Sequence, residues 1–458
     1  MADKTNKNRK TRELKKKDYS SLWHPFTQMS EWYSNDQLII ERGKGNYLYD
    51  TEGRRYLDGI SSLWVNVHGH RKREIDRAIN AQLKKIAHST LLGLASPPSI
   101  ELAEQLVKIT PKALTKVFFS DSGSTAVEIA LKIAFQYFKE TEPGSKKDRF
   151  IAFTGAYHGD TLGAMGVGEI GPFVGKYSPV IRKALRAPYP YCYRCPVKGA
   201  KDFPDCKLAC LDVFEKIIKK DHKKIAACII EPMVQGAAGM ITAPKGFLKG
   251  VRRITKKYNI LLIADEVATG FGRTGKMFAC EHDRVTPDLM CLAKGITGGY
   301  LPLAATLATE KIFKAFLGPY EDMRAFFHGH TYTGNALASA AAIANLDIFK
   351  KEKTIERLQP KIKTLSKELK KLAGLDNVGD IRQRGLMVGI ELVANKKTKK
   401  RFPATQRLGH KVCMEVRVKG IIIRPLGDTI VLMPPLSITE AELKKLTKIV
   451  FESIKRFT

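Results

Sequence analysis

The sequence predicts an α/β protein with a mainly parallel central sheet, helices on both faces, and a smaller α+β domain. Three observations support this. Continuous apolar runs at 260–264 and 289–293 have the length of fully buried strands. Helical and strand patterns alternate from about residue 98 to residue 294, as in βαβ units. The chain has 458 residues and no low-complexity linker, which favours two closely connected domains.

The N-terminal region divides into a basic tail and a short meander. Residues 1–20 are polar and basic, and we expect a frayed tail or a poorly packed helix, with ordered structure beginning near Leu22. Strands are expected at 47–50 and 55–58, separated by a turn. Residues 21–75 are therefore assigned to the N-terminal part of the small domain.

Residues 76–350 are expected to form the large domain. The strand at 116–119 enters a turn of small residues at 120–126, and an amphipathic helix follows at 127–138. This arrangement presents free backbone N–H groups to an anion, although a plain capped helix would look similar. The other expected elements are a helix at 98–107, strands at 150–153 and 225–230, and a buried alanine-rich helix at 336–350.

Residues 351–458 are expected to complete the small domain. Their patterns predict a helix from Thr354 and a last helix from Thr439. Between them the expected strands are 380–382, 387–391, 420–424 and 429–433. Helices and strands in this order are typical of an α+β lobe.

Two of the expected strands end in charged residues that packing does not require. Asp265 and Glu266 follow the run 260–264, and Lys294 follows the run 289–293. Ligands of open α/β sheets bind outside the carboxyl ends of the strands, so an acid and an amine there can face one molecule. Pyridoxal phosphate uses such a pair: a lysine for its aldehyde and a carboxylate for its pyridine nitrogen. The sequence therefore predicts pyridoxal 5'-phosphate as cofactor.

The residues around these two strand ends resemble a known signature. Asp265-Glu266-Val267, Gly270-Phe271-Gly272-Arg273-Thr274-Gly275 and Ala293-Lys294-Gly295 are similar to the signature of class III aminotransferases. The resemblance extends from Trp23 to Pro425 and implies a fold type I pyridoxal-phosphate-dependent transferase. The glycines at 270–275 also match G-x-G-x-x-G, but they do not directly follow a strand, so a dinucleotide fold is rejected.

The resemblance also implies roles for individual residues. Lys294, Asp265 and Tyr157 are the expected catalytic residues, with Tyr157 against the face of the pyridine ring. Gly123, Ser124 and Thr331 are expected to hold the cofactor phosphate, and Thr331 would reach the active site of the other subunit, which implies a homodimer with shared sites. The expected substrate-binding residues are Phe26, Trp64, Tyr157, Arg273, Lys294, Gly329 and Arg424.

Within the family, the resemblance is to members that convert 8-amino-7-oxononanoate to 7,8-diaminononanoate in biotin synthesis. S-adenosylmethionine is the expected amino donor. Lysine stays open as a donor, because Phe26 and Val431 stand where S-adenosylmethionine-dependent members carry tyrosine. Another ω-amino-acid aminotransferase of the same class is a further alternative, since only the substrate pocket would differ.

The formal net charge of +32 invites a nucleic-acid-binding function. The lysines are spread over expected helix surfaces without an alternation of basic and aromatic residues, so we expect no nucleic-acid partner. No apolar run approaches the roughly 18 residues of a membrane span, and the N-terminus lacks an apolar signal core. We therefore expect no membrane partner and a cytoplasmic protein.

Four of the eight cysteines lie close together in the sequence, in a loop rich in tyrosine, proline and lysine. They are Cys192, Cys195, Cys206 and Cys210, spaced as C-x2-C and C-x3-C. The spacing permits a zinc site with four thiolates, but reduced thiols or a redox-labile loop explain it equally well. The resemblance requires no metal here, and none is expected.

Overall fold

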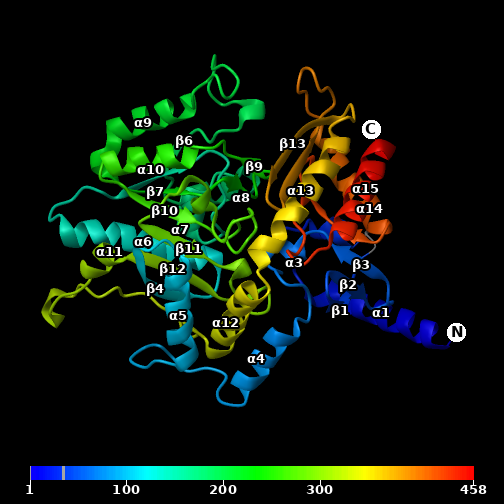
Figure 1. The fold of residues 1–458 in the computed structure, drawn as a ribbon, viewed down its shortest axis with the longest axis horizontal. Coiled ribbons are helices and arrows are strands. Elements are labelled where there is room, and N and C mark those ends of the chain that lie inside the picture. Colours follow the sequence, from blue (N-terminus) through cyan, green and yellow to red (C-terminus); the bar gives the residue numbers. More distant parts are fainter. Residues whose placement is uncertain (1, 34–36, 458) are drawn as a thin grey trace.

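A seven-stranded sheet forms the centre of the computed structural model, which describes residues 2–33 and 37–457 (Figure 1). Its strands, in spatial order, are β4 (Leu114–Ser120), β12 (Ala304–Thr309), β11 (Leu289–Leu292), β10 (Leu261–Asp265), β7 (Ile225–Ile230), β5 (Arg149–Phe153) and β6 (Leu185–Ala187). β12 runs antiparallel to both of its neighbours, and the other pairs are parallel. The predicted, mainly parallel α/β sheet is confirmed.

Helices cover both faces of this sheet. Successive strand residues point to opposite faces, and β10 shows the consequence. Leu262 belongs to the hydrophobic cluster that contains Val251 of α10 (Phe247–Lys257). The next residue, Ile263, belongs to the cluster that contains Ile133 of α6 (Gly123–Thr141). A strand that buries both faces reads as a continuous apolar run, which is why its position was predictable.

The parallel strands bring their carboxyl ends to one edge of the sheet. Glu231 follows β7, Asp265 ends β10, and Lys294 lies two residues after β11. β4 points the same way, because it is antiparallel to β12, which is itself antiparallel to β11. Residues that are far apart in the sequence are therefore collected along this edge.

The remaining elements of the large domain and of the segments that lead into it are short, apart from the four helices α4, α5, α9 and α12. They are α2 (Met29–Trp32), α3 (Ser61–Trp64), α4 (Arg73–Leu83), α5 (Pro97–Ile109), α7 (Leu162–Val167), α8 (Gly171–Val174), α9 (Ala209–Asp221), α11 (Glu310–Lys314), α12 (Ala336–Lys351), β8 (Val234–Gln235) and β9 (Ile241–Thr242). The predicted helices at 98–107, 127–138 and 336–350 fall within α5, α6 and α12 and are confirmed.

The two ends of the chain meet in a smaller lobe (Figure 1). One antiparallel sheet has the order β13 (Val378–Arg384), β14 (Met387–Leu392), β17 (Thr429–Leu432) and β16 (Arg424–Leu426). A second sheet has the order β1 (Ile40–Lys44), β2 (Tyr47–Asp50), β3 (Arg55–Asp58) and β15 (Ile421–Ile422), with β15 parallel to β3. The helices of this lobe are α13 (Thr354–Leu372), α14 (Leu408–Val418) and α15 (Glu440–Phe457). The domain boundaries after residues 20, 75 and 350 stay a prediction.

Two local expectations were wrong. The single strand expected at 420–424 is broken at Ile423, because the chain pairs with β3 in one sheet and then crosses to pair with β17 in the other. Ordered structure does not begin near Leu22 but with a helix, α1 (Ala2–Ser21). Thr11 fixes this helix to the small lobe: it is buried, and its Oγ1 lies 2.8 Å from Oγ1 of Thr51.

No helix among the described residues is long and apolar enough to cross a membrane.

Candidate active site

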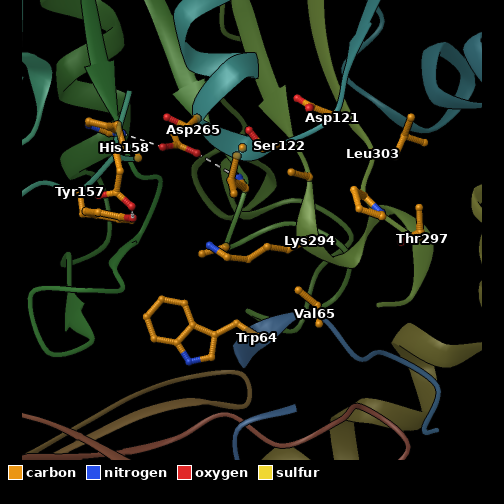
Figure 2. A pocket seen from close by; sticks show the side chains of 18 of the residues that line it. Trp64, Val65, Asp121, Ser122, Tyr157, His158, Asp265, Lys294, Thr297 and Leu303 are labelled. Carbon is orange, nitrogen blue, oxygen red and sulfur yellow. Dashed lines mark hydrogen bonds and ion pairs between the residues drawn. The ribbon is translucent and has the colours of Figure 1, made fainter. Parts of the chain in front are cut away.

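A cavity of about 730 Å³ opens at the carboxyl edge of the large sheet (Figure 2). Segments that follow β4, β5, β7, β10 and β11 line it. It brings together six of the predicted site residues: Trp64, Gly123, Ser124, Tyr157, Asp265 and Lys294. The sheet topology alone accounts for the convergence of five of these residues, because each follows or ends a strand of the same orientation.

Lys294 lies in the middle of the cavity, with Trp64 on one side and Asp265 on the other (Figure 2). Its Nζ is 5.3 Å from the centroid of the Trp64 ring. Burial lowers the pKa of the Lys294 amine, and the negative charges of Asp265 and Glu231 oppose that effect. A lowered pKa increases the neutral fraction of an amine, which is the form that acts as nucleophile or base.

Asp265 is held from two sides. Its Oδ2 lies 2.6 Å from Nδ1 of His158, and its Oδ1 accepts a hydrogen bond from the N–H of Val267 at 3.1 Å. Both Asp265 and His158 are buried. The carboxylate therefore has a fixed orientation. His158 was not among the predicted site residues, because no spacing rule links a histidine to a carboxylate 107 positions away.

A second buried carboxyl group, Glu231, lines the same cavity. It accepts hydrogen bonds from the N–H groups of Tyr157 at 3.2 Å and Gly236 at 2.9 Å. Burial raises the pKa of Glu231 to about 7, with His158 opposing the rise and Asp265 adding to it. Near neutral pH this group therefore carries only part of a negative charge. Glu231 directly follows the strand predicted at 225–230, but it was not among the predicted site residues.

Tyr157 forms one wall of the cavity and connects it to the N-terminal segment. Its hydroxyl donates a hydrogen bond to Asp160 at 2.8 Å, and burial raises its pKa. The Tyr157 ring packs edge-on against Phe173 at 5.7 Å, and Phe173 packs against Phe26 at 5.1 Å. Phe26 itself is 62% exposed and does not line the main cavity. It reaches the site only through this row of aromatic rings.

The start of α6 forms a cradle that fits a phosphate group. Gly123 and Ser124 begin this 19-residue helix and line the cavity. A Cβ at Gly123 would lie 2.5 Å from the Val267 side chain, so the close approach to the Asp265 strand end requires glycine. Ser124 Oγ accepts a hydrogen bond from the N–H of Thr161 at 3.0 Å and lies 2.7 Å from the Thr161 hydroxyl. Hydroxyl groups beside a helix N-terminus are suited to an anion.

Two predicted substrate-binding arginines have contrasting surroundings. Arg273 is 1% exposed, does not line the cavity, and donates hydrogen bonds to the carbonyl oxygens of Pro434 at 2.8 Å and Asn66 at 2.7 Å. Burial lowers its pKa to about 10. Its guanidinium thus joins the two lobes in this structure. Arg424 is partly buried, does not line the cavity, and forms no ion pair with the described residues.

The two predicted residues of the 323–335 loop lie outside the cavity of their own chain. Gly329 and Thr331 are both exposed. Val431, which bears on the choice of donor, is fully buried in the core of the small lobe, lies opposite Arg424 in the β16–β17 pair, and does not line this cavity.

All eight cysteines are free thiols. Cys192 and Cys195 are exposed, Cys206 is partly exposed, and Cys210 is buried. Within the described part of the chain, no group of three histidine, cysteine, aspartate or glutamate side chains is arranged to hold a metal ion.

Comparison with known proteins gives a consistent result across the chain. The model of the aminotransferase class-III family matches residues 28–454. A protein from Nitratidesulfovibrio vulgaris named adenosylmethionine-8-amino-7-oxononanoate aminotransferase is 54% identical over 438 residues, 95% of this chain and 80% of that protein. A protein of the same name from Geobacter sulfurreducens is 50% identical over 449 residues, 98% of each chain.

Solved structures with the same fold include enzymes with different names. The crystal structure of adenosylmethionine-8-amino-7-oxononanoate aminotransferase from Methanocaldococcus jannaschii has a TM-score of 0.92 and 47% identity, covering 98% of this chain and 99% of that one. An ω-transaminase from Pseudomonas jessenii in complex with PMP has a TM-score of 0.92 and 30% identity, covering 97% and 98%.

Proposed function

This chain belongs to the class III aminotransferases, and from that premise we propose that it transfers an amino group to 8-amino-7-oxononanoate in biotin synthesis. The product is 7,8-diaminononanoate, and the amino donor is S-adenosylmethionine. Relatives that carry the corresponding name are 50% to 54% identical over nearly the whole chain, which supports the choice of reaction. The observation that supports the chemistry is the placement of Lys294 and Asp265 in one cavity.

Class III aminotransferases depend on pyridoxal phosphate, and the residues of the cavity fit this cofactor. When bound, pyridoxal phosphate supplies an electron sink for removing a proton beside the amino group. Asp265 would hold the proton of the pyridine nitrogen, since His158 and the Val267 N–H keep its carboxylate fixed. Gly123 and Ser124 would hold the phosphate at the start of α6.

Lys294 is proposed to move the proton. Its Nζ would take the proton from the donor carbon that carries the amino group, and later deliver a proton to the corresponding carbon of the product. The lowered pKa of Lys294 makes the neutral amine available for this step. The Trp64 ring lies on one side of the amine, and Tyr157 forms another wall of the same cavity.

Arg424 is proposed to bind the carboxylate of the substrate. 8-Amino-7-oxononanoate carries its carboxylate at the far end of an apolar chain, and a guanidinium binds such a group with two hydrogen bonds. Arg424 is partly buried and has no ion-pair partner among the described residues, so it is free for this role. Phe26 and Trp64 would contact the apolar chain, whereas Arg273 would act only indirectly, through the packing of the two lobes.

The active enzyme is proposed to be a homodimer in the cytoplasm. Gly329 and Thr331 are exposed and lie outside the cavity of their own chain, so they are available to complete the site of a second copy. Eight free thiols suit a reducing compartment.

A donor screen on the cofactor-loaded protein tests the proposal. S-adenosylmethionine, lysine and ω-amino acids are added in turn while the absorbance of the bound cofactor is followed. We expect a change with S-adenosylmethionine that is reversed by 8-amino-7-oxononanoate. If only lysine gave this cycle, 8-amino-7-oxononanoate would remain the acceptor and lysine would be the donor. Lysine is included because Phe26 stands where S-adenosylmethionine-dependent members carry tyrosine.

A second candidate is an ω-transaminase, favoured by the similarity to the Pseudomonas jessenii enzyme. Conversion by ω-amino acids only, without reversal by 8-amino-7-oxononanoate, would support it and exclude the role in biotin synthesis.

A further inference from the structure

A second cavity, of about 480 Å³, lies between the large domain and the C-terminal lobe. Tyr191 and Ala238 line it from the large domain, and parts of β14, β16 and α14 line it from the lobe. It shares no lining residue with the main cavity. However, Ala237 lines the main cavity and the next residue, Ala238, lines the second one. A single stretch of backbone therefore separates the two cavities, and the proposed transamination does not use the second one.

Three basic side chains surround this second cavity: Arg401, Arg407 and His410. Arg401 has no hydrogen-bond or ion-pair partner among the described residues. Arg407 is bound to an exposed carboxylate, with its Nη1 at 2.6 Å from Oε2 of Glu31. Exposed ion pairs of this kind contribute little to stability, so Arg407 can exchange partners at low cost.

Two carboxylates also line the cavity, but donors of the protein already satisfy them. Glu391 accepts hydrogen bonds from Arg194 and Arg382, both at 2.7 Å, and from the hydroxyl of Tyr191. Asp428 accepts a hydrogen bond from the N–H of Gly409 at 2.9 Å, at the start of α14. Of the two arginines that line this cavity, Arg401 is therefore the one without an ion-pair partner among the described residues.

We propose that this cavity binds a small anion of the carboxylate or phosphate class, held by Arg401, Arg407 and His410. Guanidinium groups donate pairs of hydrogen bonds to such anions. The volume of about 480 Å³ is within the range of metabolite sites.

An anion bound in this cavity would act on two parts of the proposed substrate site, Arg424 and the segment around Phe26. This consequence rests on the proposed function. Pro425 and Leu426 line the second cavity, and Arg424 directly precedes them on β16. An anion would also compete with Glu31 for Arg407, and Glu31 lies five residues after Phe26 on α2. A bound anion would thus loosen the N-terminal segment and shift Arg424.

Calorimetric titration of the cofactor-loaded protein tests the binding site, because the cradle at α6 is then filled. Inorganic phosphate and the dicarboxylate glutarate are titrated separately at constant ionic strength, with chloride as reference. We expect saturable binding of at least one of them, and the one that binds identifies the chemical source of the ligand. In the double variant Arg401→Gln, His410→Gln the affinity should fall roughly tenfold or more.

The matched control is Lys411→Gln, which removes a positive charge from the same helix outside the cavity. It should bind as the unaltered protein does. Absence of saturable binding to the unaltered protein, or equal affinity in the double variant, would overturn the proposal. The measurement requires no amino transfer, so the anion-binding result can be interpreted even if the proposed function is wrong.

Discussion

The cofactor side and the substrate side of the main site are built differently. On the cofactor side the polar groups are bonded to one another: Asp265 to His158, which are both buried, and Ser124 to Thr161, which are partly buried. On the substrate side Phe26 is 62% exposed and Arg424 lacks an ion-pair partner among the described residues. The difference indicates that contacts within the chain fix the position of Asp265 in the cavity, whereas Phe26 and Arg424 keep surfaces that a substrate can contact.

The largest effect is expected at the amine of the cofactor side. Lys294→Ala should lower kcat by about 10⁴-fold or more, equivalent to more than about 5 kcal/mol, because it removes the group proposed to move the proton. Single-turnover kinetics with S-adenosylmethionine would measure this. Partial rescue by added methylamine would show that the missing amine, rather than misfolding, causes the loss. Near-normal turnover would contradict the assignment.

The next effect concerns the carboxylate opposite that amine. Asp265→Asn should lower kcat by about 10²–10³-fold, because an amide cannot hold the pyridine proton electrostatically. The matched variant is Glu266→Gln, since Glu266 is buried but accepts its hydrogen bonds from Thr269, Ala279 and Cys280, away from the cofactor. That variant should lower stability more than kcat. Equal losses of kcat in the two variants would show that Asp265 and Glu266 do not differ in their importance for the reaction.

On the substrate side the expected effects are smaller and fall on binding. Arg424→Gln should raise KM for 8-amino-7-oxononanoate by about 10–100-fold, about 1.4–2.8 kcal/mol, with a lesser change in kcat. Steady-state kinetics with the acceptor varied would test this. Arg417→Gln on α14 is a charge-matched control expected to leave KM unchanged. A loss confined to kcat would show that Arg424 does not grip the substrate carboxylate.

The pH dependence of stability should reveal the buried carboxyl group of the cofactor side. Burial raises the pKa of Glu231 to about 7, above its ordinary value of 4.5, so the folded protein binds the extra proton between these values. The contribution of the Glu231 carboxyl group to the stability of the folded protein is therefore fully present below pH 4.5, and it is lost as the pH rises to about 7. Glu231→Gln should therefore gain about 1–2 kcal/mol relative to the unaltered protein between pH 5 and 8. Urea unfolding at several pH values would show whether the two curves diverge or stay parallel.

The smallest effect is expected at the exposed end of the aromatic row. Phe26→Tyr adds a hydroxyl without removing the ring that packs against Phe173, so kcat/KM with S-adenosylmethionine should change by less than about tenfold. Trp64→Phe is the useful contrast, because Trp64 is buried beside Lys294 and should matter more. A larger effect at Phe26 than at Trp64 would reverse the proposed order of importance.

Much of the cofactor side could be predicted from the sequence. Buried parallel strands appear as continuous apolar runs, and the topology brings the residues at their ends to one edge. Asp265 and Lys294 therefore converge without any knowledge of side-chain contacts.

Contacts made after a turn could not be predicted in this way. The positive φ values of Phe271 (53°) and Gly272 (87°) redirect the chain just before Arg273, so its guanidinium binds carbonyl groups of distant segments instead of lining the cavity. The contact between His158 and Asp265 and the break at Ile423 likewise depend on tertiary structure. Local sequence patterns do not predict tertiary contacts or strand breaks of this kind.

The pairing of β15 with β3 has a consequence for the order of events during synthesis. Leu57 lies opposite Ile421, so β3 leaves the ribosome roughly 360 residues before the strand that completes its sheet. At roughly 5–20 residues per second, this interval lasts on the order of 20–70 s. During that time the apolar residues Tyr56 and Leu57 lack part of their final cover, so the N-terminal strands can complete their packing only after the C-terminal lobe has been synthesised.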